Sequence, residues 1–356
     1  MTRPIRATIR ACALRNNLEI ARRHAPHARQ MAVIKANAYG HGLLRAAQAL
    51  RAADGFAVLD LASAVCLRNA GFTQPVLLLE GFFEAGELPV IAREKLSVVV
   101  HCEEQLQILL GANASERVSV FVKLNTGMNR LGFEPAQLPR LLQRLRGARQ
   151  VAEVTLMTHF ANADDALGIE WQLERFDAAA REFDLPVSLA NSATVLRHPH
   201  AARGWARVGL MLYGASPLPD RSAAQLGLRP AMTLESRIIA VRELAAGERI
   251  GYGGTFTATK AMRMGVVACG YADGYPRHAP SGSPVLVAGR RTGTLGRVSM
   301  DMLCVDLSAL PEAGVGAPVV LWGEGLPVEE VAAAAGTIAY ELLCALASRV
   351  PVQDSD

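Results

Sequence analysis

Short apolar runs alternate with longer stretches of helical period between residues 31 and 213. Eight of these runs have the pattern of strands: 31–35, 56–59, 75–80, 96–100, 118–125, 154–159, 186–190 and 207–213. The stretches between them that most clearly predict helices are 43–52, 103–110, 135–146 and 170–183. This alternation predicts an α/β fold in the form of a (β/α)8 TIM-like barrel. An open doubly wound sheet is the alternative, but its glycine-rich dinucleotide turn is missing after the first run.

The pattern changes after Gly227. Strand-like runs separated by glycine and proline turns follow at 236–241, 265–269, 284–287, 303–307 and 318–322. Two apolar stretches of helical spacing come last, at 328–335 and 338–348. We therefore expect two domains, a barrel at residues 1–228 and a mostly β domain at residues 229–356. A short alternating segment around residues 5–9 and a helix-like stretch precede the first barrel run.

Composition excludes several classes of protein. The net charge is +4, and no lysine-rich run with interleaved aromatic residues suggests nucleic-acid binding. No apolar run has the length of a membrane span or of a signal-peptide core, so we expect a cytoplasmic protein without a membrane partner. The six cysteines are dispersed without a CxxC pair, which argues against a disulfide framework and a zinc site. We predict no bound metal.

The first strand run ends in a single lysine, Lys35, followed by small and turn-forming residues. In a barrel of this kind the active site forms at the carboxyl ends of the strands. An amine placed there is partly desolvated, which lowers its pKa and suits it to nucleophilic or Schiff-base chemistry. The alternative is a surface lysine that follows an edge strand.

Further candidate residues lie at or just beyond the ends of the later strand runs. They are Lys123, Asn125, Met128 and Arg130 after the fifth run, His159 after the sixth, Asn191 and Ser192 after the seventh, and Arg207, Gly209 and Leu210 within the eighth. No carboxylate pair or histidine cluster with metal-ligand spacing accompanies them. Lysine, arginine, hydroxyl groups and backbone amides together suit a phosphorylated aldehyde cofactor and a carboxylate substrate.

Nine short motifs across both predicted domains resemble those of the alanine racemase family. They are AVIKANAYGHG (32–42), KLNTGMNRLGF (123–133), MTHFANAD (157–164), ANSAT (190–194), VGLMLYGASP (208–217), GYGGTF (251–256), GYADGYPR (270–277), GRVSMDM (296–302) and GTIAYELL (336–343). The resemblance covers essentially the whole chain in order. It implies interconversion of L- and D-alanine with pyridoxal 5'-phosphate, by a two-base mechanism in a head-to-tail homodimer.

The resemblance assigns the two bases to Lys35 and Tyr252. Lys35 matches the family lysine that holds the cofactor as a Schiff base, and Tyr252 matches the second base, which comes from the partner subunit. Inversion of a stereocentre through a planar carbanion requires a proton donor and an acceptor on opposite faces, which explains the need for two bases. Without the resemblance, Tyr252 is best interpreted as a turn aromatic that covers the core.

The resemblance also implies roles for the remaining candidates. Cofactor binding falls to Tyr39, His159, Asn191, Ser192, Arg207, Gly209, Leu210 and Tyr340, and substrate binding to Arg130, Met300, Tyr271 and Asp301. Arg207 matches the residue that meets the pyridine nitrogen, and Lys123 matches a lysine that is often carbamylated. From the residues alone, Arg207 is equally compatible with a strand-end cap, Ser192 with a helix N-cap and His159 with a hydrogen-bonded core histidine.

One departure from the family pattern bears on the substrate side. Asn125 stands where the family often has aspartate, which removes a negative partner for Arg130. Two other functions remain as alternatives, a broader amino-acid racemase or decarboxylase and a non-catalytic carrier of pyridoxal phosphate on the same barrel. A role in making D-alanine for peptidoglycan and a role in breaking it down are both compatible with the sequence.

Overall fold

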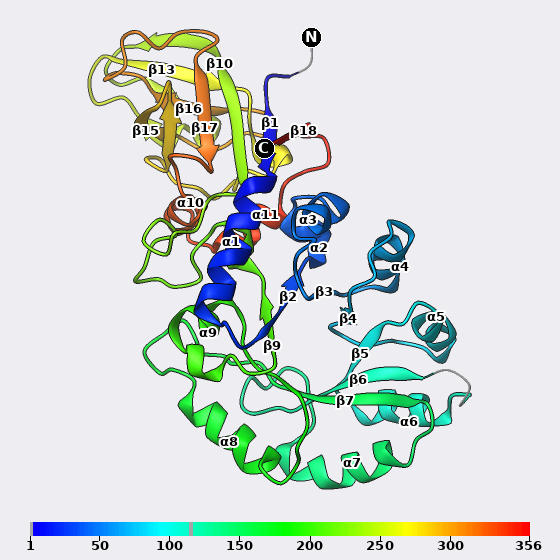
Figure 1. The fold of residues 1–356 in the computed structure, drawn as a ribbon. Helices are drawn as coiled ribbons and strands as arrows, with labels where there is room; N and C mark the ends of the chain where they lie inside the picture. Colours follow the sequence, from blue (N-terminus) through cyan, green and yellow to red (C-terminus); the bar gives the residue numbers. More distant parts are fainter. Residues whose placement is uncertain (1–2, 114–116) are drawn as a thin grey trace.

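The computed structural model of the chain describes residues 3–113 and 117–356. Its strands form two sheets of eight strands each and one separate two-stranded hairpin. The first large sheet and its helices occupy the lower part of Figure 1, and the second sheet lies above them. Long-range pairing within each sheet therefore divides the chain into two structural parts.

The first sheet is the predicted barrel. Its strands are parallel and lie in the order β8-β7-β6-β5-β4-β3-β2-β9. They are β2 (Arg29–Val33), β3 (Gly55–Val58), β4 (Val76–Leu78), β5 (Ser97–Val100), β6 (Val118–Lys123), β7 (Val151–Met157), β8 (Val187–Ser188) and β9 (Trp205–Val208). Between β8 and β9 only a single bridge, Ser188 to Gly204, approaches closure. β3, β4, β5 and β9 are buried throughout, as expected for strands covered on both faces.

All eight predicted runs overlap a barrel strand, but seven of these strands end before the predicted run does, and β5 alone reaches the predicted end. The run at 207–213 is extended only to Val208, after which Gly209 (φ −122°, ψ −96°) leads into the 3₁₀ turn η4 (Leu210–Tyr213). The run at 31–35 is extended only to Val33. The apolar pattern continues past β9 because Leu210–Tyr213 is buried, and past β2 because Ile34 is buried.

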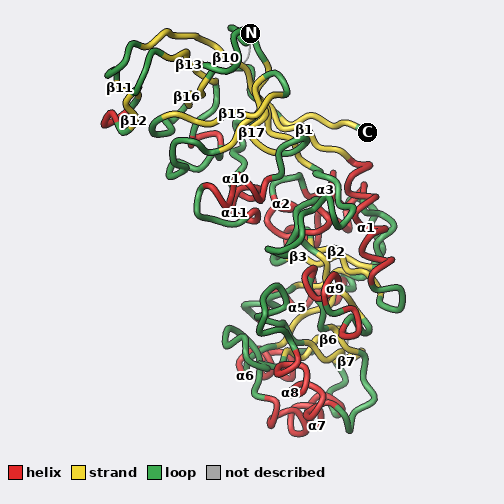
Figure 2. The backbone as a smooth tube through the Cα atoms, turned by 90° about the vertical axis from the view of Figure 1, so that its left-hand side faces the viewer, coloured by secondary structure: helices red, strands yellow, loops and turns green. Residues whose placement is uncertain are grey.

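Helices alternate with the barrel strands and cover them (Figure 2). They are α1 (Ala11–His24), α3 (Leu43–Ala49), α4 (Leu61–Asn69), α5 (Leu88–Arg93), α6 (Glu103–Gly111), α7 (Leu138–Arg146), α8 (Glu170–Ala180) and α9 (Ser192–Arg197), with short 3₁₀ turns at Ala85–Glu87, Pro135–Gln137 and Pro199–Ala201. α7 illustrates the cause of this packing. It buries Leu138, Leu141, Leu142 and Leu145, spaced at three and four residues, and carries Arg144 and Arg146 in its last turn.

The second sheet has the order β13-β16-β15-β14-β17-β10-β1-β18, and β10 also pairs with β13. Its strands are β1 (Arg6–Arg10), β10 (Met232–Leu244), β13 (Met262–Val267), β14 (Pro284–Val287), β15 (Arg290–Leu295), β16 (Leu303–Asp306), β17 (Pro318–Trp322) and β18 (Val352–Ser355). β1 runs antiparallel to β10 and parallel to β18. The segment around residues 5–9 therefore joins the second sheet, although it precedes the barrel in sequence. The division near residue 228 stays a prediction.

Three further elements complete the second part of the chain. The hairpin of β11 (Arg249–Ile250) and β12 (Phe256–Thr257) lies at the end of this part that is remote from the barrel (Figure 2). The helices α10 (Val328–Ala334) and α11 (Ala339–Cys344) lie between the second sheet and the barrel (Figure 1). Both helices match the apolar stretches predicted near the end of the sequence.

Asn17, on α1, ties the barrel to the connection that leads into the second sheet. Its side-chain amide is fully buried, donates to the carbonyl oxygens of Leu212 (2.9 Å) and Arg229 (2.8 Å), and accepts from the Arg229 N–H (2.8 Å). A buried side chain that satisfies three backbone groups stabilises this junction, because each group would otherwise lose its hydrogen bond without access to water.

Asn17→Ala should lower the free energy of unfolding by about 3 kcal/mol, because it leaves those backbone groups unpaired. Urea unfolding followed by circular dichroism measures the change. Asn16→Ala is the matched control, since Asn16 is only half-buried and contacts the same connection at the Gly227 carbonyl, so its loss should cost less than about 1 kcal/mol. Equal unfolding midpoints for the two variants would contradict the assignment.

Candidate active site

Lys35 lies just beyond the carboxyl end of β2, at the start of the short segment α2 (Lys35–Tyr39). This segment is not a right-handed helix, because Ala36, Asn37, Ala38 and Tyr39 have φ values of 53°, 52°, 54° and 51°. Left-handed backbone costs a non-glycine residue about 1–2 kcal/mol. Four such residues in a row form a strained turn, and strain of this kind gathers at functional sites.

Hydrogen bonds made by His41 and Asn37 hold this left-handed turn in place. Nδ1 of His41 lies 2.8 Å from the Tyr39 carbonyl oxygen and 3.0 Å from that of Ala38, so its proton is on Nδ1. Complete burial lowers the pKa of His41 to about 4, which keeps the ring neutral. Asn37 closes the turn by accepting the Leu43 N–H at 2.9 Å. His41 lies inside the first motif, and no other feature of the sequence marks it as part of the site.

Tyr39 projects from this turn into an aromatic cluster. Its ring stacks on Tyr213, with centroids 4.6 Å apart, and lies 5.8 Å from the ring of Tyr340 on α11. A Cβ atom on Gly209 would lie 2.7 Å from the Tyr39 hydroxyl oxygen, so only glycine permits this approach. Burial raises the pKa of Tyr39, which keeps its hydroxyl protonated and able to donate. Tyr39, Gly209 and Tyr340 are therefore brought together as the resemblance implies.

Ser192 lies against the same loop from the side of α9. Its Oγ accepts the Gly209 N–H at 2.9 Å. The N-cap of α9 is made by Asn191, whose Oδ1 accepts the Thr194 N–H at 2.9 Å, and not by Ser192, which is the first helical residue. The hydroxyl groups of Ser192 and Tyr39 thus lie together beside the Gly209 backbone, and two neutral donors placed in this way suit a phosphate group.

Arg207 is buried within the barrel at the carboxyl end of β9 and is 4 % exposed. Nη1 donates to the Ser188 carbonyl oxygen (2.7 Å) and Oγ (2.8 Å), and Nη2 donates to the Thr158 carbonyl oxygen (2.8 Å) and faces His159 Nδ1 (3.4 Å). Nε makes no hydrogen bond to any residue that the structure describes. Burial lowers the pKa of Arg207 only to about 10, so it stays charged. The guanidinium is rigidly held with one donor left over, which suits an acceptor such as a pyridine nitrogen.

Positive charge accumulates around Arg207. Lys123, at the end of β6, is 6 % exposed, and burial followed by the charges of Arg207, Arg130 and Lys35 lowers its pKa to about 8. Glu80 is the one acidic group that opposes this shift.

Burial and the same four cations, Arg207, Lys123, Arg130 and Lys35, also lower the pKa of His159 to about 3, so that it is neutral. Four cations so close together, two of them (Lys123 and Arg207) buried, are unfavourable by themselves. Such a cluster of four cations fits a dianionic phosphorylated cofactor and a carboxylate substrate.

Asn125 orders the loop that carries Arg130. Its Oδ1 accepts the N–H groups of Gly127 (3.2 Å) and Asn129 (3.0 Å), and its Nδ2 donates to Glu134 Oε1 (3.2 Å). Arg130 itself is exposed and makes no ion pair with the described residues. The residue that departs from the family pattern therefore shapes the loop through an amide that serves as donor and acceptor together, which an aspartate cannot do.

The candidates on the second sheet lie on exposed turns. Tyr252 is 72 % exposed on η5 (Tyr252–Gly254), and Met300 is 53 % exposed. Tyr271 is on η6 (Tyr271–Asp273), and Asp301 accepts a hydrogen bond from Arg349 at 2.6 Å. Because η5 joins β11 to β12, Tyr252 belongs to the hairpin that is remote from the barrel (Figure 2). Within the single chain, this hairpin and the segment α2, which begins at Lys35, lie far apart (Figure 2).

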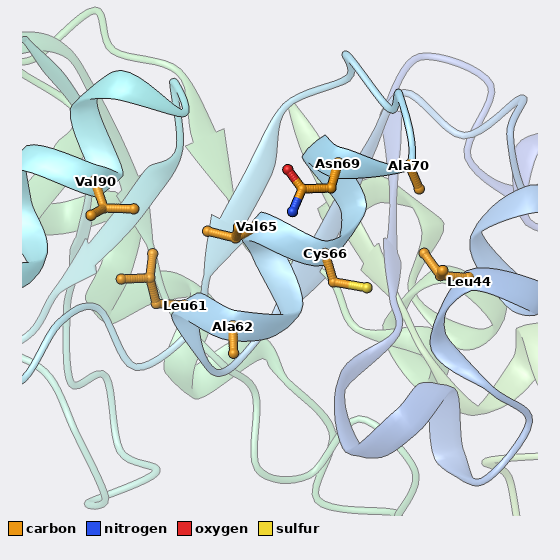
Figure 3. Close-up of a pocket in the computed structure, with 8 residues that line it drawn as sticks. All are labelled: Leu44, Leu61, Ala62, Val65, Cys66, Asn69, Ala70 and Val90. Atoms are coloured by element: carbon orange, nitrogen blue, oxygen red, sulfur yellow. The ribbon is translucent and has the colours of Figure 1, made fainter.

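Other features of the chain do not belong to this site. An apolar groove lies on the outside of the barrel between α3, α4 and α5 (Figure 3), and it is lined by Leu44, Leu61, Ala62, Val65, Cys66, Asn69, Ala70 and Val90. Within residues 3–113 and 117–356, no three His, Cys, Asp or Glu side chains gather in a metal-binding arrangement. None of the described helices combines the length and the apolar character that crossing a membrane requires.

Comparison with known proteins covers both parts of the chain. The family model for the alanine racemase N-terminal domain matches residues 9–217, and the model for the alanine racemase C-terminal domain matches residues 231–353. The chain is 58% identical to an alanine racemase of Nitrosomonas eutropha over 356 residues, which is 99% of each chain. It is 54% identical to a catabolic alanine racemase of Klebsiella aerogenes over 353 residues, again 99% of each.

A solved structure agrees with these relatives. The biosynthetic alanine racemase of Pseudomonas aeruginosa superimposes with a TM-score of 0.97 at 50% identity, and 100% of each chain is covered. Both family models match this chain, its relatives are similar to it over their full length, and its fold superimposes on that of an alanine racemase. The chain therefore belongs to the alanine racemase family.

Proposed function

We propose that this protein interconverts L- and D-alanine with pyridoxal 5'-phosphate joined to Lys35. The observation that carries the proposal is the position of Lys35 on a strained turn at the mouth of the barrel. The chain is also similar over its full length to alanine racemases. The four-cation cluster supports an anionic cofactor and substrate at the same place.

The cofactor's residues follow from the contacts of the site. Tyr39, Ser192, Tyr340 and the backbone of Gly209 and Leu210 would hold the phosphate, and Asn191 fixes this cradle by capping α9. Bound pyridoxal phosphate would supply a covalent attachment point for the amino group and an electron sink for the α-carbon. Arg207 Nε would face the pyridine nitrogen, and because a guanidinium keeps its proton, that nitrogen stays unprotonated. A weaker electron sink favours return of the proton over side reactions.

Two bases on opposite faces of the substrate would carry out the inversion. Lys35 Nζ would take or return the α-proton on one face, and Tyr252 Oη of the partner subunit would do so on the other. Arg130 would fix the substrate carboxylate, with Met300, Tyr271 and Asp301 on the substrate side. Tyr252 is too remote from its own Lys35, which supports a head-to-tail homodimer.

The alternatives are distinguishable. A broader racemase on this barrel would accept larger side chains, and a carrier would bind the cofactor without turnover. The relatives include both a biosynthetic and a catabolic enzyme, so either direction of D-alanine use is compatible with this family. We infer a cytoplasmic location, where the free amino acid and the cofactor are available.

Incubation of L-alanine with the protein and pyridoxal phosphate should drive the circular dichroism of the amino acid to zero without loss of alanine. Enantiomers have equal free energy, so a racemase must end at an equal mixture. A persistent signal with bound cofactor would overturn the proposal in favour of the carrier. A signal lost together with alanine would indicate decarboxylation or transamination.

Complementation tests the origin of the second base. Lys35→Ala and Tyr252→Phe should each reduce kcat by about 10²–10⁴-fold as homodimers. A heterodimer of the two, isolated through two different affinity tags, contains one site with both bases if Tyr252 acts across subunits, and should show about half of the wild-type activity per dimer. A Lys35→Ala/Tyr252→Phe double variant paired with itself is the matched control. An inactive heterodimer would show that both bases come from one chain.

Lys123 is the residue most suited to carbamylation. The reaction joins the free amine to CO₂ with release of one proton and turns a cation into an anion beside Arg130 and Arg207. The lowered pKa of about 8 leaves a substantial fraction of the amine unprotonated at neutral pH, whereas an ordinary lysine is almost fully protonated. The new carboxylate would compensate the charges of Arg207 and Arg130.

Removal of CO₂ at pH 6 should lower activity, because protonation of the Lys123 amine below its pKa of about 8 removes the species that reacts. Activity should return at pH 8 only when bicarbonate is added. A ¹³C-bicarbonate sample should give a carbamate resonance that is missing in Lys123→Met, which serves as the control. Full recovery without bicarbonate would contradict the assignment.

A further inference from the structure

Asp273 is a buried carboxylate that the chemistry above does not use. It is 0 % exposed and follows Tyr271 by two residues on η6. Burial alone would raise the pKa of this carboxyl, but hydrogen bonds from Arg3, Arg349 and the Gly270 N–H lower it overall, so it is ionised. A buried ionised carboxylate costs free energy unless every partner is in place.

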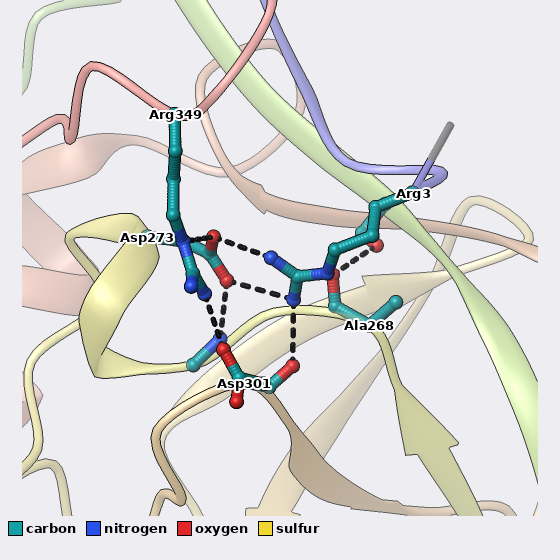
Figure 4. A network of polar contacts seen from close by, with 7 residues as sticks. Arg3, Ala268, Asp273, Asp301 and Arg349 are labelled. Atoms are coloured by element: carbon teal, nitrogen blue, oxygen red, sulfur yellow. Dashed lines mark hydrogen bonds and ion pairs between the residues drawn. The ribbon is translucent and has the colours of Figure 1, made fainter.

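Two arginines distant in sequence supply these partners. Nη1 and Nη2 of Arg3 donate to the two carboxylate oxygens of Asp273 at 2.7 and 3.0 Å, and Nε of Arg349 donates to Oδ1 at 2.7 Å. Figure 4 shows Arg3 and Arg349 converging on Asp273 from two sides, with Asp301 beside them. Arg3 lies in the segment before β1, and Arg349 lies between α11 and β18.

The same arginines also hold the loop that contains Met300. Nη2 of Arg3 donates to the Asp301 carbonyl oxygen at 2.8 Å, and Nη2 of Arg349 donates to Asp301 Oδ1 at 2.6 Å. We call Arg3, Asp273, Asp301 and Arg349 the ion cluster. It contains two cations and two anions, so its formal charge is balanced.

The ion cluster thus connects two turns that also touch through their backbones. The Tyr271 N–H donates to the Ser299 carbonyl oxygen, and the Ala272 N–H donates to that of Met300, both at 3.0 Å. A Cβ on Gly270 would lie 2.3 Å from the Ser299 carbonyl oxygen, so these backbones are as close as they can be. A change in the ion cluster would therefore move Tyr271 and Met300 together.

We propose that Arg3 and Asp273 are positioning residues that fix Tyr271 and Met300 where they meet the substrate, so that the segment before β1 sets the affinity for alanine. This rests on the proposed function, in which those two residues line the substrate side. Neither Arg3 nor Asp273 takes part in proton transfer, so the ion cluster acts on KM and not on kcat.

Arg3→Met tests the proposal with Arg6→Met as its matched control. Arg6 lies three residues further along, its side chain is 44% exposed against 39% for Arg3, and it pairs with Glu235 without touching either turn. Arg3→Met should raise KM for both alanine enantiomers by about fivefold or more and leave kcat within about twofold. Arg3→Lys retains a charged donor group, so its KM should lie between those of the wild type and Arg3→Met. Arg6→Met should change neither constant.

Hydrogen exchange gives a second readout that does not depend on activity. Peptides covering 270–275 and 298–302 should exchange faster in Arg3→Met than in wild type and Arg6→Met, because both turns lose a common anchor. An unchanged KM in Arg3→Met overturns the proposal whatever the exchange rates, and so does a fall in kcat at constant KM. Wild-type protein that does not racemise alanine, with the exchange difference still present, overturns the proposed function and leaves the ion cluster's effect on the two turns intact.

Discussion

The left-handed turn after β2 is the constraint on which the rest of the site depends. Four successive residues adopt a backbone that is unfavourable for each of them, so their neighbours must impose it. His41 holds the carbonyl groups at the end of the turn, and α11 presses on it from outside, since a Cβ on Gly40 would lie 2.2 Å from the Leu343 carbonyl oxygen. α11 follows the second sheet in sequence. The loop that carries Lys35 is therefore complete only when both parts of the chain have folded.

Electrostatics adds a second dependence. The cations at the barrel mouth lower the pKa values of Lys123 and His159, so the ligand-free site contains unfavourable charge repulsion. An anion that binds there relieves this repulsion and stabilises the folded chain at the same time. Binding of an anionic ligand and stability of the folded chain are thus linked through one charge distribution.

Much of this architecture is visible in the sequence, for identifiable reasons. Barrel strands buried on both faces give continuous apolar runs, which is why all eight were found. The sheet that β1 joins was not predictable, because alternation of apolar and polar residues indicates a half-buried strand but not the strands with which it pairs. The left-handed turn was not predictable either, since Lys35–Tyr39 contains ordinary helix-forming residues and tertiary contacts decide its hand.

Contacts between residues far apart in the chain are the hardest to predict from the sequence. Arg3 and Asp273 are 270 residues apart, and no local pattern connects them. Tyr252 was assigned by resemblance, because an exposed tyrosine on a glycine-rich turn has no distinguishing feature of its own.

The place of β1 between β10 and β18 has a consequence for synthesis. Its pairing partner in β10 lies 229 residues further along at the Arg6–Glu235 contact. During translation the barrel sequence therefore emerges while β1 still has two unpaired edges, and sheet contacts of such separation form slowly. An edge of this kind invites pairing with other chains until β10 arrives. The nascent chain is thus most vulnerable to aggregation while its barrel is already being made, and this is the interval in which a chaperone would have most effect on yield.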